Sequence, residues 1–384
     1  MRKSSFRLVL ILVFTACISG LYLPKDFWFD ELWTLKAWVA RGLRGVFTEY
    51  RQPNNHIIFS GTLLFWKHLC CWLGLPEKCL RLLPWLFSLG GVALIYQSVK
   101  LWRGPAAALW AALLLGSSHC FLYYSCQLRG YPLSYLEYGL GLYLMLKLLQ
   151  KPSAWKLAAY NLVVILSVGT LPTNLIPFFC LGLWGALALY QTGKLKTDEG
   201  KLIAVSLLLS PIGGMLWYFW HPTVRAQFFW HAMSAHSNRA AVELLLATLN
   251  RTFRDWLWLI PFFASGIYLF CIRGRTKVEI EQPWSFGWFA AAVFLPLLGG
   301  FFLAYYPRNF SPLITWWCVV LGVLINESCK AIIGRWPKLR PLPVVLLIIL
   351  CSLSAVREIS LAVEKPLYLY PWNDPRPFSS RGNP

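Results

Sequence analysis

Two adjacent carboxylates stand in an aromatic stretch near the start of the chain, where Asp30 and Glu31 lie within residues 25–33 (KDFWFDELW). In a partly desolvated setting such a pair could act as a general base or hold a divalent cation, because desolvation raises the basicity of a carboxylate. The competing interpretation is an N-terminal acidic pair for a helix that begins at Leu32, where negative charge complements the helix dipole. The spacing leaves both interpretations open.

A second polar cluster, residues 52–56 (QPNNH), directly precedes an apolar stretch. Asn55 and His56 would supply amide and imidazole groups at the N-terminus of a helix, a position that favours anions. A plain helix cap and turn explains the same residues. We therefore treat both as candidate substrate-binding residues.

Two arginines stand at predicted membrane boundaries: Arg129 within Gln127–Tyr131 (QLRGY), and Arg308 within the stretch YYPRN. An arginine at a boundary can extend its charge into water with no further role, or it can bind a lipid phosphate. Gln127 and Tyr131 are candidate substrate contacts beside Arg129. Glu137, inside an apolar run, is either a functional carboxylate or a structural hydrogen-bonding group.

The composition excludes several classes of protein. Apolar residues make up 57% of the 384 residues and charged residues 14%, against about 25% charged in soluble proteins. The mean hydropathy is +0.53, so lipid must cover much of the surface. The sequence has no glycine-rich phosphate loop, GxSxG motif or CxxC pair, which argues against an ATP-driven pump, a serine hydrolase and a cysteine metal site.

These residues must be positioned by membrane helices, because runs of about 20 apolar residues are typical of membrane spans. We predict an all-α polytopic membrane protein with about eleven spans and interfacial amphipathic helices. The predicted spans are 7–23, 80–99, 106–124, 131–149, 157–170, 173–191, 202–220, 256–272, 285–304, 309–326 and 342–356.

A further apolar segment, residues 57–75, is predicted to lie in the membrane interface, since Lys67 near its middle would cost roughly 2.5–3.5 kcal/mol to insert. If this segment does not cross, the N-terminus and alternate short loops face the cytoplasm, and those regions hold half of the 36 basic residues. If it crossed, that positive-inside pattern would invert. A second amphipathic helix on the membrane is predicted from the spacing of Leu32, Leu35, Trp38 and Val39.

This orientation predicts a membrane domain over 1–356 with outer-face loops at 25–79 and 221–255, and a proline-rich outer tail at 357–384. The net charge of +20 follows from the cytoplasmic loops, and no nucleic-acid partner is predicted. The histidines of the second outer loop, His221, His231 and His236, are spaced too loosely to indicate a metal site.

Four motifs in order carry a resemblance to a known family: Phe29-Asp30-Glu31, Asn54-Asn55-His56, the stretch 124–131 (YSCQLRGY) and the stretch 307–312 (PRNFSP). Over roughly residues 1–325, the sequence resembles the GT-C superfamily of membrane glycosyltransferases. More narrowly, it is similar to bacterial relatives of protein O-mannosyltransferases and of the lipid A aminoarabinose transferase, which are family 39-like enzymes. It departs from them at Ile57-Ile58, where many relatives have prolines, and at Gln127, where many have a carboxylate.

The resemblance implies transfer of a sugar from a polyprenyl-phosphate donor to a glycan, lipid or peptide hydroxyl, on the outer (periplasmic) face of the inner membrane. Asp30 would be the base or orient the acceptor, and Glu31 would support it or help to hold a cation. Arg129 and Arg308 would contact the donor phosphate, with His56 at the mouth of the cavity. No cofactor is predicted other than a candidate divalent cation at Asp30 and Glu31. The alternative is a polyprenyl-lipid transporter or a non-catalytic membrane scaffold, which would need the arginines but not the two carboxylates.

Overall fold

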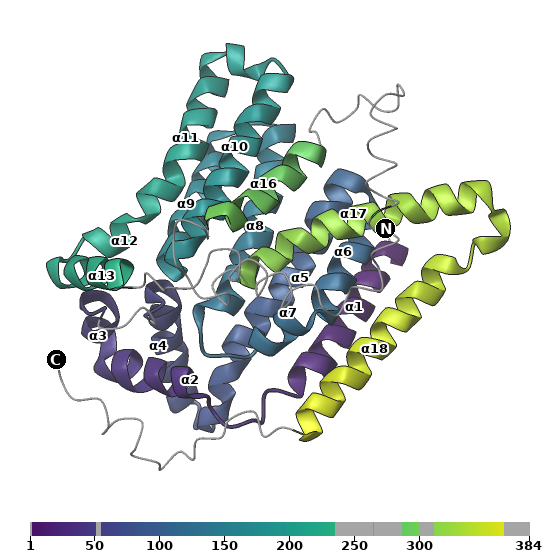
Figure 1. The fold of residues 1–384 in the computed structure, drawn as a ribbon. Helices are drawn as coiled ribbons and strands as arrows, with labels where there is room; N and C mark the ends of the chain where they lie inside the picture. Colours follow the sequence, from purple (N-terminus) through teal and green to yellow (C-terminus); the bar gives the residue numbers. More distant parts are fainter. Residues whose placement is uncertain (1, 51–54, 235–263, 265–285, 300–310, 365–384) are drawn as a thin grey trace.

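The computed structural model describes residues 2–50, 55–234, 264, 286–299 and 311–364 (Figure 1). Every regular element within these ranges is a helix, which agrees with the predicted all-α membrane protein. Five helical segments are long and apolar enough to cross a membrane, judged by length and composition. They are Glu77–Arg103, Pro172–Gln191, Asp198–Phe219, Ser311–Arg335 and Pro337–Val363. The predicted count of eleven is not confirmed, and the predicted span 256–272 lies outside the described residues.

The body of the molecule is a bundle of helices whose small residues allow close contact. A Cβ atom at Gly91 would lie 2.9 Å from the carbonyl oxygen of Tyr135, and one at Gly322 would lie 2.5 Å from the backbone nitrogen of Ala111. Membrane helices associate through such packing, because the lipid gives them no hydrophobic driving force. α5 packs along α8, α6 packs between α5 and α17, and α11 packs against α9 and α10. The bundle helices are α1 (Arg2–Gly20), α5 (Leu82–Arg103), α6 (Pro105–Ser117), α8 (Gly130–Gln150), α9 (Ala154–Thr170), α10 (Leu175–Gln191), α11 (Asp198–Gly214), α16 (Phe286–Gly299), α17 (Ile314–Arg335) and α18 (Leu342–Glu364).

Two predicted spans differ from the helices in the structure. The predicted span 106–124 is two helices, α6 and α7 (His119–Tyr124), because Ser118 between them has an extended backbone. The last helix, α18, continues beyond the predicted end at residue 356, so Arg357 lies in this helix and not in a coiled tail. Arg357 donates to Glu358 and to the carbonyl of Ser117, and these contacts hold the extension in place.

A group of shorter helices lies at the lower left of the molecule in Figure 1, away from the turn between α17 and α18. The group comprises α2 (Phe29–Trp33), a π-helical turn (Thr34–Trp38), α3 (Gly42–Thr48), α4 (Ile57–Trp72), α12 (Leu216–Phe219) and α13 (Pro222–Ser234). The prediction of an amphipathic helix lying on the membrane here was wrong in one respect. Leu35, Trp38 and Val39 are at most 4% exposed and pack against the protein, so the protein and not the lipid covers their apolar face.

α4 is the segment predicted to be interfacial. Its 16 residues span about 24 Å at 1.5 Å per residue, less than the roughly 30 Å of a hydrocarbon core. Phe59 and Leu63 are fully buried, whereas Phe65 and Trp72 are 67% and 81% exposed. One face of α4 therefore packs on the protein and the other presents apolar side chains outward. The interfacial position of this segment stays a prediction.

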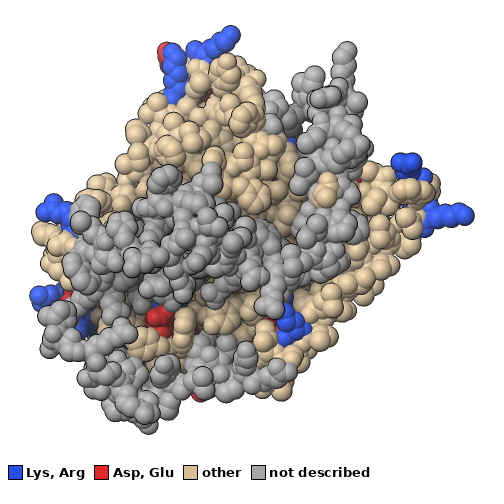
Figure 2. All heavy atoms as spheres, viewed as in Figure 1, with Lys and Arg blue, Asp and Glu red and all other residues tan. Residues whose placement is uncertain are grey.

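Basic residues gather at the ends of the bundle. Figure 2 shows them at the tip between α10 and α11 and at the turn between α17 and α18. Lys194 and Lys196 lie at the first position, and Lys338 lies at the second. Both loops belong to the side that the charge pattern predicts to be cytoplasmic.

Candidate functional site

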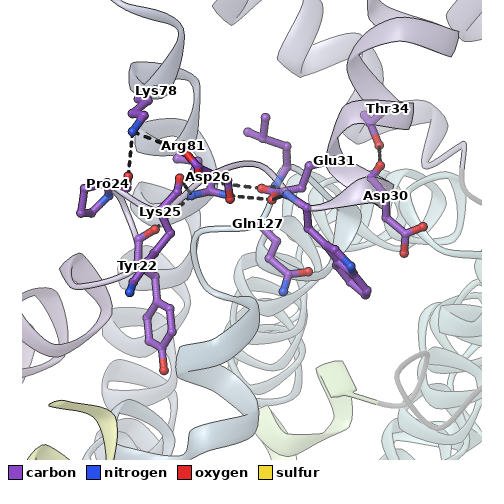
Figure 3. A network of polar contacts seen from close by, with 12 residues as sticks. Tyr22, Pro24, Lys25, Asp26, Asp30, Glu31, Thr34, Lys78, Arg81 and Gln127 are labelled. Carbon is purple, nitrogen blue, oxygen red and sulfur yellow. Dashed lines mark hydrogen bonds and ion pairs between the residues drawn. The ribbon is translucent and has the colours of Figure 1, made fainter. Parts of the chain in front are cut away.

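The carboxylate of Glu31 is fully buried and is the centre of a polar network on the first outer loop (Figure 3). Glu31 is the third residue of α2, and its Oε2 accepts from the backbone N–H of Trp28 at 2.7 Å, which caps the helix. Its Oε1 accepts from the backbone N–H of Leu128 at 2.9 Å. The guanidinium of Arg81 completes the set, with Nη2–Oε2 at 2.6 Å and Nε–Oε1 at 3.1 Å. Glu31 thus joins three segments that are far apart in the sequence.

Arg81 also binds three backbone carbonyl oxygens just before α2. Its Nη1 donates to the carbonyl oxygens of Tyr22 at 3.1 Å and Lys25 at 2.5 Å, and its Nη2 donates to that of Asp26 at 2.8 Å. Its guanidinium also lies 4.9 Å from the ring centroid of Phe27. A planar guanidinium with five donors suits such a multiple contact, which an ammonium group could not reproduce. The Glu31–Arg81 pair therefore fixes the path of the chain into α2.

This pairing changes the role expected for Glu31. Both of its oxygens accept from N–H groups, and its charge is balanced by Arg81 at 2.6 Å. A base or cation ligand needs an accessible lone pair, so we assign Glu31 to positioning. Arg81 was not among the candidate residues predicted from the sequence, although it is a basic residue on the predicted outer face and so runs against the charge bias as Arg129 does. That bias was the signal that could have identified it.

The side chain of Asp30 points in a different direction from that of Glu31 (Figure 3) and forms a second ion pair. Its Oδ2 lies 3.0 Å from Nη1 of Arg129, and the side chains are 9% and 2% exposed. Arg129 precedes α8 with an extended backbone, and its guanidinium lies 5.7 Å from the ring centroid of Tyr131. The structure therefore brings together Asp30 and Arg129, two residues predicted independently from different motifs.

His56 approaches the same place from the start of α4. Its ring lies 5.7 Å from that of Tyr131, edge to face. A Cβ atom at Gly130 would lie 3.0 Å from the His56 ring, so glycine allows this approach. Nδ1 of His56 lies 3.2 Å from the carbonyl oxygen of Thr170. Because a carbonyl only accepts, Nδ1 carries the proton and Nε2 is the lone-pair nitrogen of the neutral ring.

Asn55 and Gln127 are buried beside these residues, at 1% and 2% exposure. The amide of Asn55 donates to the carbonyls of Val46 and Glu49, both at 2.9 Å, so it closes the loop between α3 and α4. The amide of Gln127 donates to the carbonyl of Tyr123 at 3.2 Å. Their carbonyl oxygens, Oδ1 and Oε1, are buried without a hydrogen-bond donor in the described part of the chain. Such atoms can accept from hydroxyl donors of a ligand.

Two further ionisable side chains, Cys126 and Glu137, lie in this region. Burial raises the pKa of the Cys126 thiol to about 12, so it stays protonated and is a poor nucleophile near neutral pH. Glu137 accepts a hydrogen bond from Thr170 Oγ1 at 2.7 Å, and the carbonyl oxygen of the same Thr170 contacts His56.

The remaining predicted donor-phosphate ligand, Arg308, lies outside the described residues.

The donor set does not fit a divalent cation in the part of the chain that the structure describes. Asp30 and Glu31 each face a guanidinium, which would repel a cation at the same oxygens. No group of three or more histidine, cysteine, aspartate or glutamate side chains among the described residues could hold a metal ion. We derive no step through a cation.

Comparison with known proteins supports the fold. No family model and no curated protein sequence matches the chain. Its structure is similar to that of the oligosaccharyltransferase AglB of Archaeoglobus fulgidus, an enzyme of the GT-C-type glycosyltransferase fold. For AglB in complex with an inhibitory peptide and a dolichol-phosphate, the TM-score is 0.55 at 12% identity, over 94% of this chain and 56% of AglB. For the crystal structure of the A. fulgidus oligosaccharyltransferase with Zn and sulfate, the values are 0.54 and 12%, over 91% and 53%.

The chain therefore spans little more than half the length of the enzyme that it resembles. At this level of identity the likeness shows the fold alone, an all-α membrane fold similar to that of AglB. The narrower resemblance to family 39-like enzymes is not confirmed by these comparisons.

Proposed function

We propose that this protein is a membrane glycosyltransferase that moves a sugar from a polyprenyl-phosphate donor to an acceptor hydroxyl. The observation that carries the proposal is the buried Asp30–Arg129 pair at the start of α8, with His56 and Tyr131 beside it. The GT-C-type fold supports it, as does the dolichol-phosphate bound to AglB, which is a polyprenyl-type lipid phosphate. The acceptor belongs to a glycan, a lipid or a peptide.

The reaction is a direct displacement at the anomeric carbon with inversion. The acceptor oxygen forms the new bond to that carbon, and the bond from the carbon to the phosphate oxygen breaks. The phosphate leaves as a polyprenyl monophosphate, and the acceptor proton passes to the carboxylate of Asp30. Cations near the departing oxygens stabilise the charge that develops there, which is the role of Arg129 and, by motif, of Arg308.

The ion pair gives Asp30 a way to respond to the donor. In the structure Oδ2 of Asp30 lies 3.0 Å from Nη1 of Arg129. A donor phosphate that binds Arg129 in place of Asp30 frees Oδ2 to accept the proton of the acceptor hydroxyl. Donor binding then prepares the carboxylate for the acceptor.

The charge pattern favours the outer face for this reaction, with the N-terminus in the cytoplasm and the active site periplasmic at the inner membrane. Glu31 and Arg81 hold the loop that carries Asp30, and the buried carbonyl oxygens of Asn55 and Gln127 are acceptors for sugar hydroxyls. In this proposal the membrane domain and its two outer loops keep the bounds predicted above, and α18 continues to Glu364 before the rest of the outer tail.

The test is sugar transfer or release by purified protein with a panel of polyprenyl-monophosphate sugars. Asp30→Asn is compared with wild type and with Asp26→Asn, a matched control in the same loop whose side chain is 85% exposed. We expect Asp30→Asn to lose about 100- to 10,000-fold in rate per amount of folded protein, and Asp26→Asn to stay near wild type.

Equal turnover by Asp30→Asn and wild type would keep the transferase and remove Asp30 from its centre. Tight donor binding without turnover by wild type, with every sugar and acceptor class tried, would instead support the polyprenyl-lipid transporter or the non-catalytic scaffold.

A further inference from the structure

Three cysteines flank the turn that connects α4 to the bundle. Cys70 and Cys71 stand in the last turn of α4, and Cys79 lies in the short 3₁₀-helix Glu77–Arg81 that follows. All three are free thiols in this structure. None of the motifs in the sequence analysis includes them, and the proposed reaction does not use them.

The turn after α4 brings the 3₁₀-helix back against α4. The N–H of Leu75 donates to the carbonyl of Cys70 at 2.9 Å, and Gly74 before it has a φ of +66°, which glycine adopts without strain. The indole N–H of Trp66 donates to the carbonyl of Cys79 at 3.2 Å. Trp66 and Cys70 are one turn apart on the same face of α4. Cys79 therefore lies against the face of α4 that carries Cys70.

Burial and electrostatics distinguish Cys70 from Cys71 as the neighbour of Cys79. Cys70 is buried in an apolar cluster with Leu63 and Leu80, and Cys79 packs against the same cluster, whereas Cys71 is exposed. Burial raises the pKa of the Cys70 thiol above its usual value, and the Cys79 thiol raises it further, ahead of the adjacent Cys71 thiol. Because such an effect weakens with distance, the thiol of Cys79 lies near that of Cys70.

The geometry of a disulfide excludes the pair that is adjacent in the chain. A disulfide usually joins residues whose Cα atoms are about 4.4–6.8 Å apart. A trans peptide bond holds neighbours such as Cys70 and Cys71 about 3.8 Å apart, and in a helix their side chains point about 100° away from each other. Cys70 and Cys79 belong to two elements that contact each other and carry no such restriction.

We propose that Cys70 and Cys79 form a disulfide bond in cells and that Cys71 stays a free thiol. The inference rests on the proposed topology, which places residues 25–79 on the outer face, where the compartment is oxidising. It does not depend on glycosyl transfer, and its test requires no turnover.

The bond forms by exchange with an oxidant that itself carries a disulfide, such as an oxidised dithiol oxidoreductase. The thiolate of Cys79, which is more exposed than Cys70, attacks one sulfur of that disulfide and releases the other as a thiolate. The sulfur of Cys70 then attacks Cys79 and displaces the second. The two cysteines lose two electrons and two protons, and the oxidant leaves as a dithiol.

The bond braces the candidate site. Cys79 precedes Arg81 in the same 3₁₀-helix, and the guanidinium of Arg81 holds Glu31 and three carbonyls of the first outer loop. His56 directly precedes α4. A bond from Cys70 to Cys79 therefore fixes the element that carries Arg81 to the helix that follows His56.

The test is differential alkylation of the full-length protein from cells quenched with acid, which prevents further exchange. Free thiols are first blocked with N-ethylmaleimide in denaturant. Disulfides are then reduced, the released thiols are labelled with deuterated N-ethylmaleimide, and tandem mass spectrometry assigns each label to a residue. Cys79→Ser removes one partner, and Cys71→Ser is the matched control in the same turn.

We expect Cys70 and Cys79 to carry the deuterated label, and Cys71 the first label, in the wild-type protein. Cys71→Ser should keep the bond, whereas Cys79→Ser should leave Cys70 with the first label. Reduction of the wild type, or the Cys79→Ser change, should lower the melting temperature by about 4–8 °C. Cys71→Ser should melt as the wild type does.

Three results would overturn the proposal, and they have different consequences. The first label on both Cys70 and Cys79, in cells where a membrane-impermeant maleimide reaches Cys71, would remove the disulfide and keep the topology. The first label on both, with Cys71 out of reach of that reagent, would remove the outer-face position together with the disulfide. The deuterated label on Cys71 in place of Cys70 would assign the bond to the wrong partner.

Discussion

Replacing Arg81 by leucine should destabilise the whole outer loop. The substitution leaves the carboxylate of Glu31 fully buried, with two backbone N–H donors but no counter-ion. It also removes the donors to the carbonyls of Tyr22, Lys25 and Asp26. The loop that carries Asp30 then loses the contacts that fix its path.

The size of the expected loss of stability in Arg81→Leu follows from the burial of the ion pair. The side chains of Arg81 and Glu31 are 2% and 0% exposed, so solvent screens their interaction little. Removing one partner of a buried pair costs about 3–5 kcal/mol. The three carbonyl bonds do not add in full, because the freed carbonyls can rebond to water. At roughly 2 °C per kcal/mol for a chain of this size, the melting temperature should fall by about 5–10 °C.

The assay is thermal unfolding of purified protein in detergent, followed by intrinsic fluorescence. Arg335→Leu is the control, because Arg335 is an exposed arginine whose guanidinium lies over the ring of Trp336. A double variant, Glu31→Leu with Arg81→Leu, should recover part of the loss, since no charge is then left unpaired. The reasoning would be refuted by an Arg81→Leu protein that melts with wild type, or by a double variant whose loss equals the sum of the single losses.

Three other substitutions test the site, the bundle and the orientation. Gly130→Ala places a methyl group 3.0 Å from the ring of His56. Sugar transfer should therefore fall by roughly tenfold or more at an unchanged melting temperature. A fully active Gly130→Ala enzyme would show that the position of His56 does not matter. Gly322→Val meets the backbone of α6 at 2.5 Å and should lower stability by about 1–3 kcal/mol, measured by thermal unfolding. In intact cells, a membrane-impermeant maleimide should label the exposed Cys71 on α4, which is predicted to lie on the outer face. The reagent should not label a cysteine that replaces Thr197, in a basic loop predicted to be cytoplasmic. The reverse labelling pattern would invert the proposed topology.

The residues of the candidate site could be identified from the sequence because their types are rare in such a chain. With 14% charged residues, polar clusters beside apolar runs are conspicuous, and Asp30, His56 and Arg129 were each found in this way. The partners could not be found, since Glu31 and Arg81 are 50 residues apart and nothing local pairs them. The partner of Glu31, which bears on the cation role considered for it, is therefore visible only in the structure.

The contact between Glu358 on α18 and His119 was not predicted at all. Glu358 and His119 are 239 residues apart, so nothing in the local sequence pairs them. Proline residues further along the chain led to the expectation of a coiled tail from residue 357. The structure extends α18 instead, because polar contacts with Ser117 and Tyr22 stabilise its last turns.

The sequence by itself determined the all-α class, the membrane setting and the polar clusters, because apolar length and composition act locally along the chain. Tertiary packing decided what each polar group does. The amphipathic stretch around Trp38 shows the difference: the periodicity predicts an apolar face, but only the positions of α4 and its neighbours decide that protein covers it. Likewise, two adjacent carboxylates have different partners because α2 turns Glu31 toward Arg81 and Asp30 toward Arg129. Pairing across many tens of residues depends on the global fold, and no local pattern encodes it.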